Sequence, residues 1–264
     1  METRYVAAPD GVRIAYDMTG EGPCLLLLHG HTETRGEWHE TGYVERLRAE
    51  FTVVTVDVRG QGESDAPDDP AYYTVDRVHA DMLAVVDARG FQRFSVWGYS
   101  FGAAIALRLA ARTERLTRVV IAGCPFGHTY PPDLVERSVA QARTVLAAKE
   151  RGKLDALPLT PAQRATAERL NIPAHIACLR ALASWPAVAP HELRCPALVY
   201  AGMEDEAVAP QLEIQRQGIE AAGIALHLFP GLDHAGEFVD MGTVLPLVMP
   251  FLRAKSPSHV WDGD

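Results

Sequence analysis

The stretch from Phe94 to Leu107 constrains the fold of this chain more than any other, because it predicts a strand followed almost at once by a helix. Residues 94–97 are mostly apolar or aromatic, and residues 103–107 are strong helix formers. Gly98 and Gly102 flank Ser100 and remove the Cβ atoms that would clash in so sharp a turn. An ordinary Gly/Ser loop is the alternative. The context favours a serine at an exposed tip, with helix amides behind it.

Composition sets the broad class of the protein. The 264 residues suffice for one large domain or for a domain with an insertion. Hydrophobic residues make up 48% of the chain, so a full core can form. The formal net charge of −9 argues against nucleic acid and anionic membranes as partners. A small molecule is the expected partner, and a homodimer is left open.

The cysteines and the N-terminus bear on the compartment. Four scattered cysteines without a C-x-x-C pair are typical of buried free thiols in a reducing cytoplasm. The polar N-terminus predicts no signal peptide, and no apolar run reaches membrane length. The sequence therefore predicts a cytoplasmic protein.

Strand-like and helical patterns alternate over most of the chain, which predicts βαβ units and a parallel sheet with helices on both faces. The predicted strands are 4–7, 12–16, 24–28, 51–56, 94–97, 116–122, 196–202 and 225–229. The predicted helices of this regular pattern include 37–50, 75–90, 211–222 and 241–253. The tail, 255–264, is polar and expected to be loose.

The alternation stops between residues 125 and 190, where prolines divide several helical pieces and no strand-like run occurs. The length predicts an inserted helical cap, since simple crossovers are shorter. Two ordinary helices lying flat on the sheet are the alternative. The predicted organisation is a core of residues 1–124 and 191–264 with a cap of residues 125–190.

Polar side chains follow the predicted parallel strands, and in open parallel sheets ligands gather at these carboxyl ends. Ser100, Asp205 and His234 are among them. A serine nucleophile needs a base to take its proton, and the base needs an acid to hold its tautomer. His234 lies in a loop after the last strand, where its imidazole could reach Ser100.

Five motifs in order resemble those of the α/β-hydrolase fold superfamily over nearly the whole chain. They are His29-Gly30, Asp57-x-Arg59-Gly60-x-Gly62-x-Ser64, Gly98-Tyr99-Ser100-Phe101-Gly102, Gly202-Met203-Glu204-Asp205 and His234. The order Ser, Asp, His is that of the superfamily. The resemblance implies a mostly parallel, doubly wound, eight-stranded α/β sheet with an inserted helical cap.

The resemblance also implies catalytic roles. Ser100 would be the nucleophile, His234 the base and then the acid, and Asp205 the orienting carboxylate. Glu204 and Glu206 flank Asp205 and could replace it, but the Gly-x-x-Asp spacing favours Asp205.

The oxyanion hole would consist of the backbone N–H groups of His31 and Phe101. Loss of one such donor typically costs about 3 kcal/mol. The His31 side chain could face either a pocket or solvent. Neither a cofactor nor a metal is expected, because no further ligands cluster near His29-x-His31.

Substrate contacts are expected from a few histidine and aromatic side chains, with packing under the cap as the alternative. They are His31, Tyr99, His128, Tyr130 and Trp185, with His175 as a further cap residue.

A serine at position 100 argues against the superfamily's epoxide hydrolases and haloalkane dehalogenases, which use aspartate there. The sequence predicts hydrolysis of a carboxylic ester or lactone of a small to medium hydrophobic substrate through an acyl-enzyme on Ser100. Carbon–carbon bond hydrolysis, perhydrolysis and hydroxynitrile cleavage are alternatives with the same three residues. A non-catalytic ligand receptor is the alternative from another class.

Overall fold

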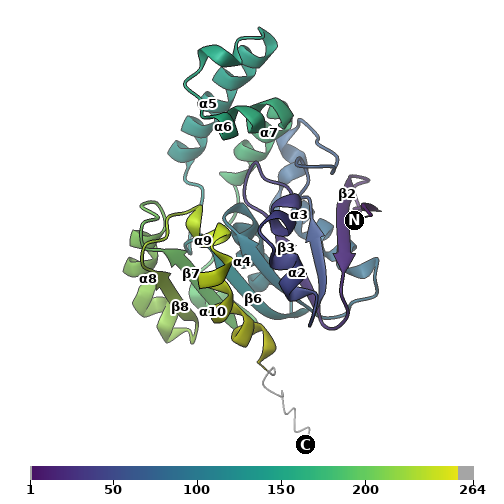
Figure 1. The fold of residues 1–264 in the computed structure, drawn as a ribbon, viewed down its shortest axis with the longest axis vertical. Helices are drawn as coiled ribbons and strands as arrows, with labels where there is room; N and C mark the ends of the chain where they lie inside the picture. The colour runs from purple at the N-terminus through teal and green to yellow at the C-terminus, as the bar shows by residue number, and fades with distance from the viewer. Residues whose placement is uncertain (1, 255–264) are drawn as a thin grey trace, which may run out of the picture.

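One eight-stranded sheet organises the protein in a computed structural model that describes residues 2–254 (Figure 1). The strand order is β1-β2-β4-β3-β5-β6-β7-β8. The β1–β2 and β2–β4 pairs are antiparallel, and every other neighbouring pair is parallel. The strands are β1 (Arg4–Ala7), β2 (Arg13–Thr19), β3 (Cys24–Leu28), β4 (Thr52–Val56), β5 (Phe94–Tyr99), β6 (Leu116–Ala122), β7 (Ala197–Gly202) and β8 (Ala225–Phe229). The predicted mostly parallel α/β sheet is confirmed.

Helices cover both faces of this sheet. In β3, Leu25 and Leu27 join one core cluster, and Leu26 and Leu28 join the other, because successive strand residues point to opposite faces. One face packs against α3 (Val75–Asp87), α4 (Phe101–Arg112) and α8 (Ala209–Ala221). The other packs against α1 (Gly36–Glu40), α2 (Tyr43–Leu47), α9 (Gly236–Val239) and α10 (Met241–Arg253). The continuous apolar run of residues 24–28 is therefore buried on both sides.

The predicted helix 37–50 is wrong in its continuity. Gly42 has a φ of +83° and separates α1 from α2. A left-handed residue of this kind ends a helix, and glycine adopts it without a Cβ penalty. Trp38, Val44 and Leu47 are nevertheless buried, as the pattern predicted.

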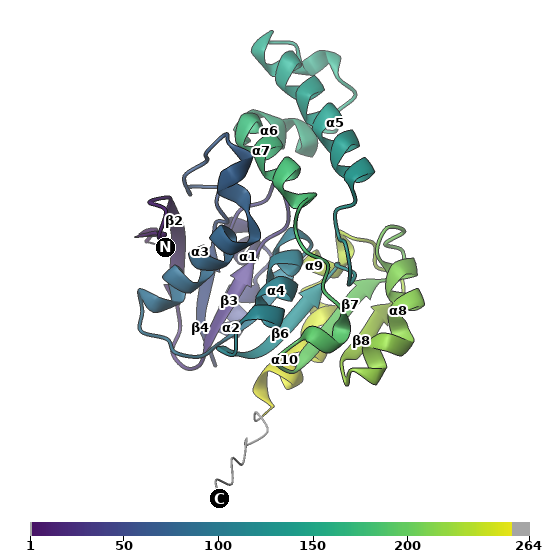
Figure 2. The same ribbon diagram turned by 180° about the vertical axis from the view of Figure 1, so that it is seen from behind.

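Residues 125–190 carry α5 (Pro132–Glu150), α6 (Pro161–Arg169) and α7 (Ile172–Leu182), which stand above the rest of the molecule in Figures 1 and 2. We call these residues the helical segment. An isolated β-bridge between Gly127 and Val188 joins the two ends of the segment. The boundaries of a cap domain stay a prediction.

Within residues 2–254, none of the helices has the length and apolar character needed to cross a membrane. The closing helix α10 continues through Pro246 and Pro250. The prediction for the tail, 255–264, lies outside the described residues.

Candidate active site

The turn between β5 and α4 places Ser100 alone between a strand and a helix. Ser100 has φ 52° and ψ −110°, a conformation that is strained for a residue with a Cβ atom. A Cβ on Gly98 would overlap the carbonyl oxygen of Gly102, and one on Gly102 would overlap the carbonyl oxygen of Leu28. Close backbone approach therefore requires both glycines, as the sequence predicted.

Substituting Gly102→Ala is expected to lower the free energy of unfolding by about 2 kcal/mol or more, because the new methyl group meets backbone that cannot move aside. Gly218→Ala is the matched control. Gly218 lies in α8 with no atom within 4 Å of the added Cβ. This change is expected to stabilise the protein by about 0.5–1 kcal/mol. Urea unfolding of both variants checks the prediction, and equal stabilities would contradict it.

A chain of hydrogen bonds joins Ser100, His234 and Asp205. His234 Nε2 lies 3.0 Å from Ser100 Oγ, and His234 Nδ1 lies 2.6 Å from Asp205 Oδ2. Asp205 is buried, whereas Glu204 and Glu206 are exposed. The structure therefore brings Asp205, and neither neighbouring glutamate, to His234.

Charge in this cluster favours a protonated imidazole beside an ionised carboxylate. Burial alone would lower the pKa of His234, but the nearby carboxylates outweigh it and raise that pKa. Burial alone would raise the pKa of Asp205, but the hydrogen bond with His234 lowers it. Backbone N–H groups of Ala207 and Val208 also donate to Asp205 Oδ1, at 3.0 and 3.1 Å. The Asp205 carboxylate is thus fixed in orientation with one oxygen facing His234.

The loop after β3 is held against the start of α4. Gly102 N–H donates to the carbonyl oxygen of His29, and His29 Nε2 accepts from Val58 N–H at 3.1 Å. Gly30 N–H donates to Glu33 Oε2 at 2.7 Å. Burial raises the pKa of Glu33 to about 7. These contacts fix the backbone on either side of His31.

The two residues predicted to supply the oxyanion donors are neighbours in space, and the centroids of their side-chain rings, His31 and Phe101, are 4.8 Å apart. Within residues 2–254, the backbone N–H groups of these two residues donate to no protein acceptor. Both groups are therefore available to an oxygen atom of a ligand.

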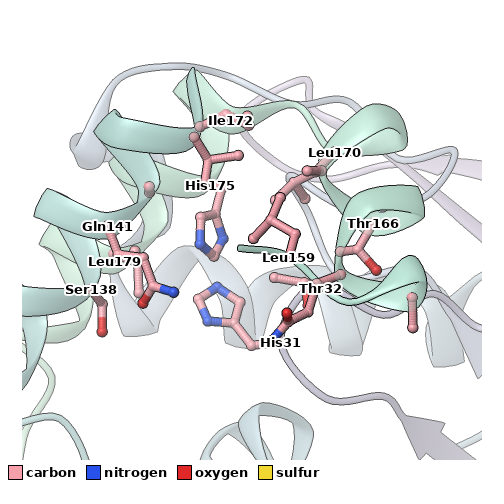
Figure 3. Close-up of a pocket in the computed structure, with 15 residues that line it drawn as sticks. His31, Thr32, Ser138, Gln141, Leu159, Thr166, Leu170, Ile172, His175 and Leu179 are labelled. Atoms are coloured by element: carbon pink, nitrogen blue, oxygen red, sulfur yellow. The ribbon is translucent and has the colours of Figure 1, made fainter. Parts of the chain in front are cut away.

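A cavity of about 430 Å³ lies between the loop after β3 and the helical segment (Figure 3). The side chain of His31 forms part of its wall, which answers the question that the sequence left open. His31 and His175 point toward one another, with ring centroids 4.5 Å apart. Further lining residues include Ser138, Gln141, Leu159, Leu170 and Leu179. None of the lining residues is Asp, Glu, Lys or Arg.

The other predicted pocket residues lie elsewhere, and none of them lines this cavity. Tyr99 is buried against Phe238, with its hydroxyl donated to the carbonyl oxygen of His234. His128 is exposed, and Tyr130 packs half-buried against the core. Trp185 is buried and donates its indole N–H to Tyr73. Tyr99, Tyr130 and Trp185 therefore have packing contacts and His128 is exposed, and their contact with a substrate stays a prediction.

The sequence did not predict the residues on α5 and α6 that line the cavity, because an amphipathic helix does not show which neighbour its inner face meets. It also missed Glu237, whose Oε1 lies 3.3 Å from His234 Nδ1. One side-chain nitrogen or oxygen atom from each of Asp205, His234 and Glu237 lies within 4.8 Å of the other two.

The Asp57–Asp65 loop holds backbone in place. Asp57 accepts from the backbone N–H groups of Arg35 and Glu63, at 2.7 and 2.9 Å. A Cβ on Gly62 would overlap the Asp57 carboxylate, which explains this glycine. Ser64 Oγ donates to the Asp57 carbonyl oxygen and accepts from Ala15 N–H, so the loop is tied to β2.

Comparison with known proteins identifies a matching family and a partial relative. The sequence model of a family described as "alpha/beta hydrolase fold" matches residues 23–218. A stretch of 125 residues is 33% identical to mouse Epoxide hydrolase 4 and covers 46% of this chain and 34% of that protein. The chain therefore spans about a third of the length of this curated relative.

Two solved structures share the fold. A hydrolase from Pseudomonas aeruginosa PA01 superimposes with a TM-score of 0.78 at 24% identity, over 96% of this chain and 99% of that one. The enol-lactonase from Burkholderia xenovorans LB400 gives 0.74 at 23% identity, over 95% and 100% of the two chains.

Proposed function

The chain belongs to the α/β-hydrolase fold family, and we propose that it is a serine hydrolase that cleaves a carboxylic ester or lactone through an acyl-enzyme on Ser100. The observation that carries the proposal is the hydrogen-bonded chain of Ser100, His234 and Asp205 at the strained turn after β5. A nucleophile, a base within reach of its proton and an acid that orients the base are the parts such a reaction needs.

In the proposed reaction, Ser100 Oγ attacks the carbonyl carbon while His234 Nε2 takes the hydroxyl proton. The carbonyl oxygen becomes negative and receives hydrogen bonds from the backbone N–H groups of His31 and Phe101. His234 then returns the proton to the leaving alcohol, and water hydrolyses the acyl-enzyme with His234 again as base. Asp205 holds the Nδ1–H tautomer throughout.

The cavity would suit a neutral, partly hydrophobic substrate; Ser100 and His234 are not among its lining residues, and His31 links the cavity to the proposed oxyanion site. Its wall carries no fixed charge. Burial lowers the pKa of His175 to about 4 and that of His31 well below its usual range, so both rings are neutral at pH 7. The leucines and alanines of the wall would bind an apolar acyl group, and its volume lies in the range of small-molecule pockets. In this proposal the helical segment acts as a cap over the substrate.

Epoxide opening is a second candidate reaction, suggested by the similarity to an epoxide hydrolase. That similarity covers less than half of this chain, and the residues of the site argue against the reaction. The resemblance to the superfamily implies that its epoxide hydrolases use an aspartate as nucleophile, whereas residue 100 of this chain is a serine. Ester and lactone hydrolysis suits the hydroxyl nucleophile and the two unoccupied N–H donors. Carbon–carbon hydrolysis with the same three residues stays the alternative.

Labelling with a fluorophosphonate probe tests the proposal. Attachment of one probe molecule at Ser100, found by peptide mass spectrometry, is expected. A panel of p-nitrophenyl esters of increasing chain length, with lactones and a carbon–carbon substrate beside them, is expected to show turnover of short to medium esters or lactones. Absence of labelling together with absence of turnover across the panel would contradict the proposal.

A further inference from the structure

Glu237 is a buried residue beside His234 that has no role in the proposed mechanism. It belongs to α9, three residues after His234, and its side chain is fully buried. Its Oε2 accepts a hydrogen bond from Gly202 N–H at 2.5 Å, and its Oε1 lies 3.3 Å from His234 Nδ1. Two carboxylates, those of Asp205 and Glu237, therefore approach the same imidazole nitrogen.

The backbone around Glu237 leaves room for this carboxylate. Gly123, directly after β6, has a φ of +63°, and a Cβ there would overlap Glu237 Oε1. That Cβ would also lie 2.9 Å from His234 Cε1. The ends of β6 and β7 thus contribute one glycine each, Gly123 for space and Gly202 for a hydrogen bond. The surrounding backbone therefore provides both space and a hydrogen-bond donor for the buried Glu237 carboxylate.

The buried oxygen Oε1 has no hydrogen-bond partner of standard geometry in residues 2–254. Burying a carboxylate without a partner is costly, so a compensating positive charge is required. In the proposed mechanism, the cationic group beside Glu237 is the imidazolium of His234, which must form whenever Ser100 gives up its proton. The Glu237 carboxylate is therefore stabilised most when His234 is protonated.

We propose that Glu237 is a positioning residue that shares the Nδ1 proton of His234 with Asp205 and stabilises the imidazolium. The inference rests on the proposed function of His234 as the base. When Ser100 transfers its proton to Nε2, the Nδ1 proton stays on the ring between the two carboxyl groups, so no further proton is consumed. Glu237 touches no substrate atom and acts only through His234.

Other titratable groups near His234 have separate contacts. Tyr99 donates its hydroxyl to the His234 carbonyl oxygen, and Glu33 accepts from Gly30 N–H. Burial raises the pKa of Glu237, and His234 and Gly202 partly offset that rise. Removing Glu237 thus removes one of the two carboxyl groups at Nδ1 and leaves the hydrogen bonds of Tyr99 and Glu33 in place.

An NMR titration of the His234 imidazole, carried out on the Ser100→Ala protein, tests the inference without depending on hydrolytic activity. Glu237→Gln is expected to lower the pKa of His234 by about 1 or more. Glu204→Gln is the matched control, because Glu204 is exposed and close in sequence to Asp205. It is expected to leave that pKa unchanged.

A second measurement uses the protein with Glu237 intact. With ¹³C-labelled glutamate, the Glu237 carboxyl resonance is expected to shift at the same pH as the His234 ring, because the two groups share one proton network. In the active enzyme, Glu237→Gln should move the acidic limb of kcat/KM to lower pH, whereas a purely structural loss would lower kcat without moving it.

An unchanged His234 pKa in a folded Glu237→Gln protein would overturn the inference. If that variant does not fold, independent titration of the two resonances in the Ser100→Ala protein would overturn it equally. Failure of the proposed function would be distinct, since it would show as absent labelling of Ser100 while the titrations still report the coupling.

Discussion

Replacing Ser100 by alanine is expected to reduce kcat/KM for ester hydrolysis by about 10⁶-fold. The substitution removes the atom that would carry the acyl group and leaves His234 without its 3.0 Å partner. The backbone at this position already has a φ of 52°, so alanine must accept the same strain that serine does. The thermal midpoint should therefore change little while activity is lost. Steady-state kinetics and thermal unfolding on the same preparation check both parts.

Ser95→Ala is the control for this experiment. Ser95 lies on the same strand, β5, and its hydroxyl forms a hydrogen bond with Thr117 Oγ1 at 2.6 Å. Its replacement is expected to leave kcat/KM within a small factor of the parent protein. Retention of most hydrolysis by Ser100→Ala would show that another group is the nucleophile.

Much of the fold follows from local patterns in the sequence. The apolar run of β3 is typical of a strand covered on both faces, and both core clusters contain it. The error at α1 and α2 lies at Gly42. The buried residues on either side fit one helical pattern, but this glycine adopts a left-handed conformation that interrupts it.

The site was harder to predict than the fold, because its residues come from parts of the chain that are far apart in sequence. Parallel strand ends share one edge of the sheet, so the meeting of Ser100, Asp205 and His234 could be expected from order alone. Their proposed roles stay predictions. Glu237 could not be expected, because its place beside His234 depends on the short helix α9 and on the space left by Gly123. A glutamate three residues after the histidine is the signal that the sequence offers.

The side chains that line the proposed substrate cavity could not be predicted from the sequence either. Ser138 and Gln141 come from α5 and line the same cavity as His31 because the helical segment lies over the loop after β3. Tyr99 and Trp185 are aromatic residues near the site, yet each has a buried hydrogen bond that explains it without a substrate. Residue type alone therefore does not distinguish a lining residue from a packing one.

Asp205→Asn is expected to lower kcat/KM by about 10²-fold. Ala207 and Val208 donate backbone N–H groups to Asp205 Oδ1, so the asparagine oxygen must take that place. The amide NH₂ then faces His234 Nδ1, where the carboxylate oxygen was. A donor at this position favours the tautomer with the proton on Nε2, which cannot accept the proton of Ser100. Kinetics at saturating and at limiting substrate check the loss.

The double variant Asp205→Asn/Glu237→Gln is expected to lose about 10⁴-fold, the effect of removing the only carboxylate from such a histidine. In the single Asp205→Asn variant, Glu237 Oε1 lies 3.3 Å from Nδ1 and can still accept its proton, so the single loss should be smaller. Glu204→Gln combined with Asp205→Asn is the control, since Glu204 is exposed and cannot replace the lost oxygen. A double variant no worse than Asp205→Asn alone would mean that Glu237 does not hold the histidine. A single variant that already loses the full 10⁴-fold would mean that Asp205 alone controls the tautomer.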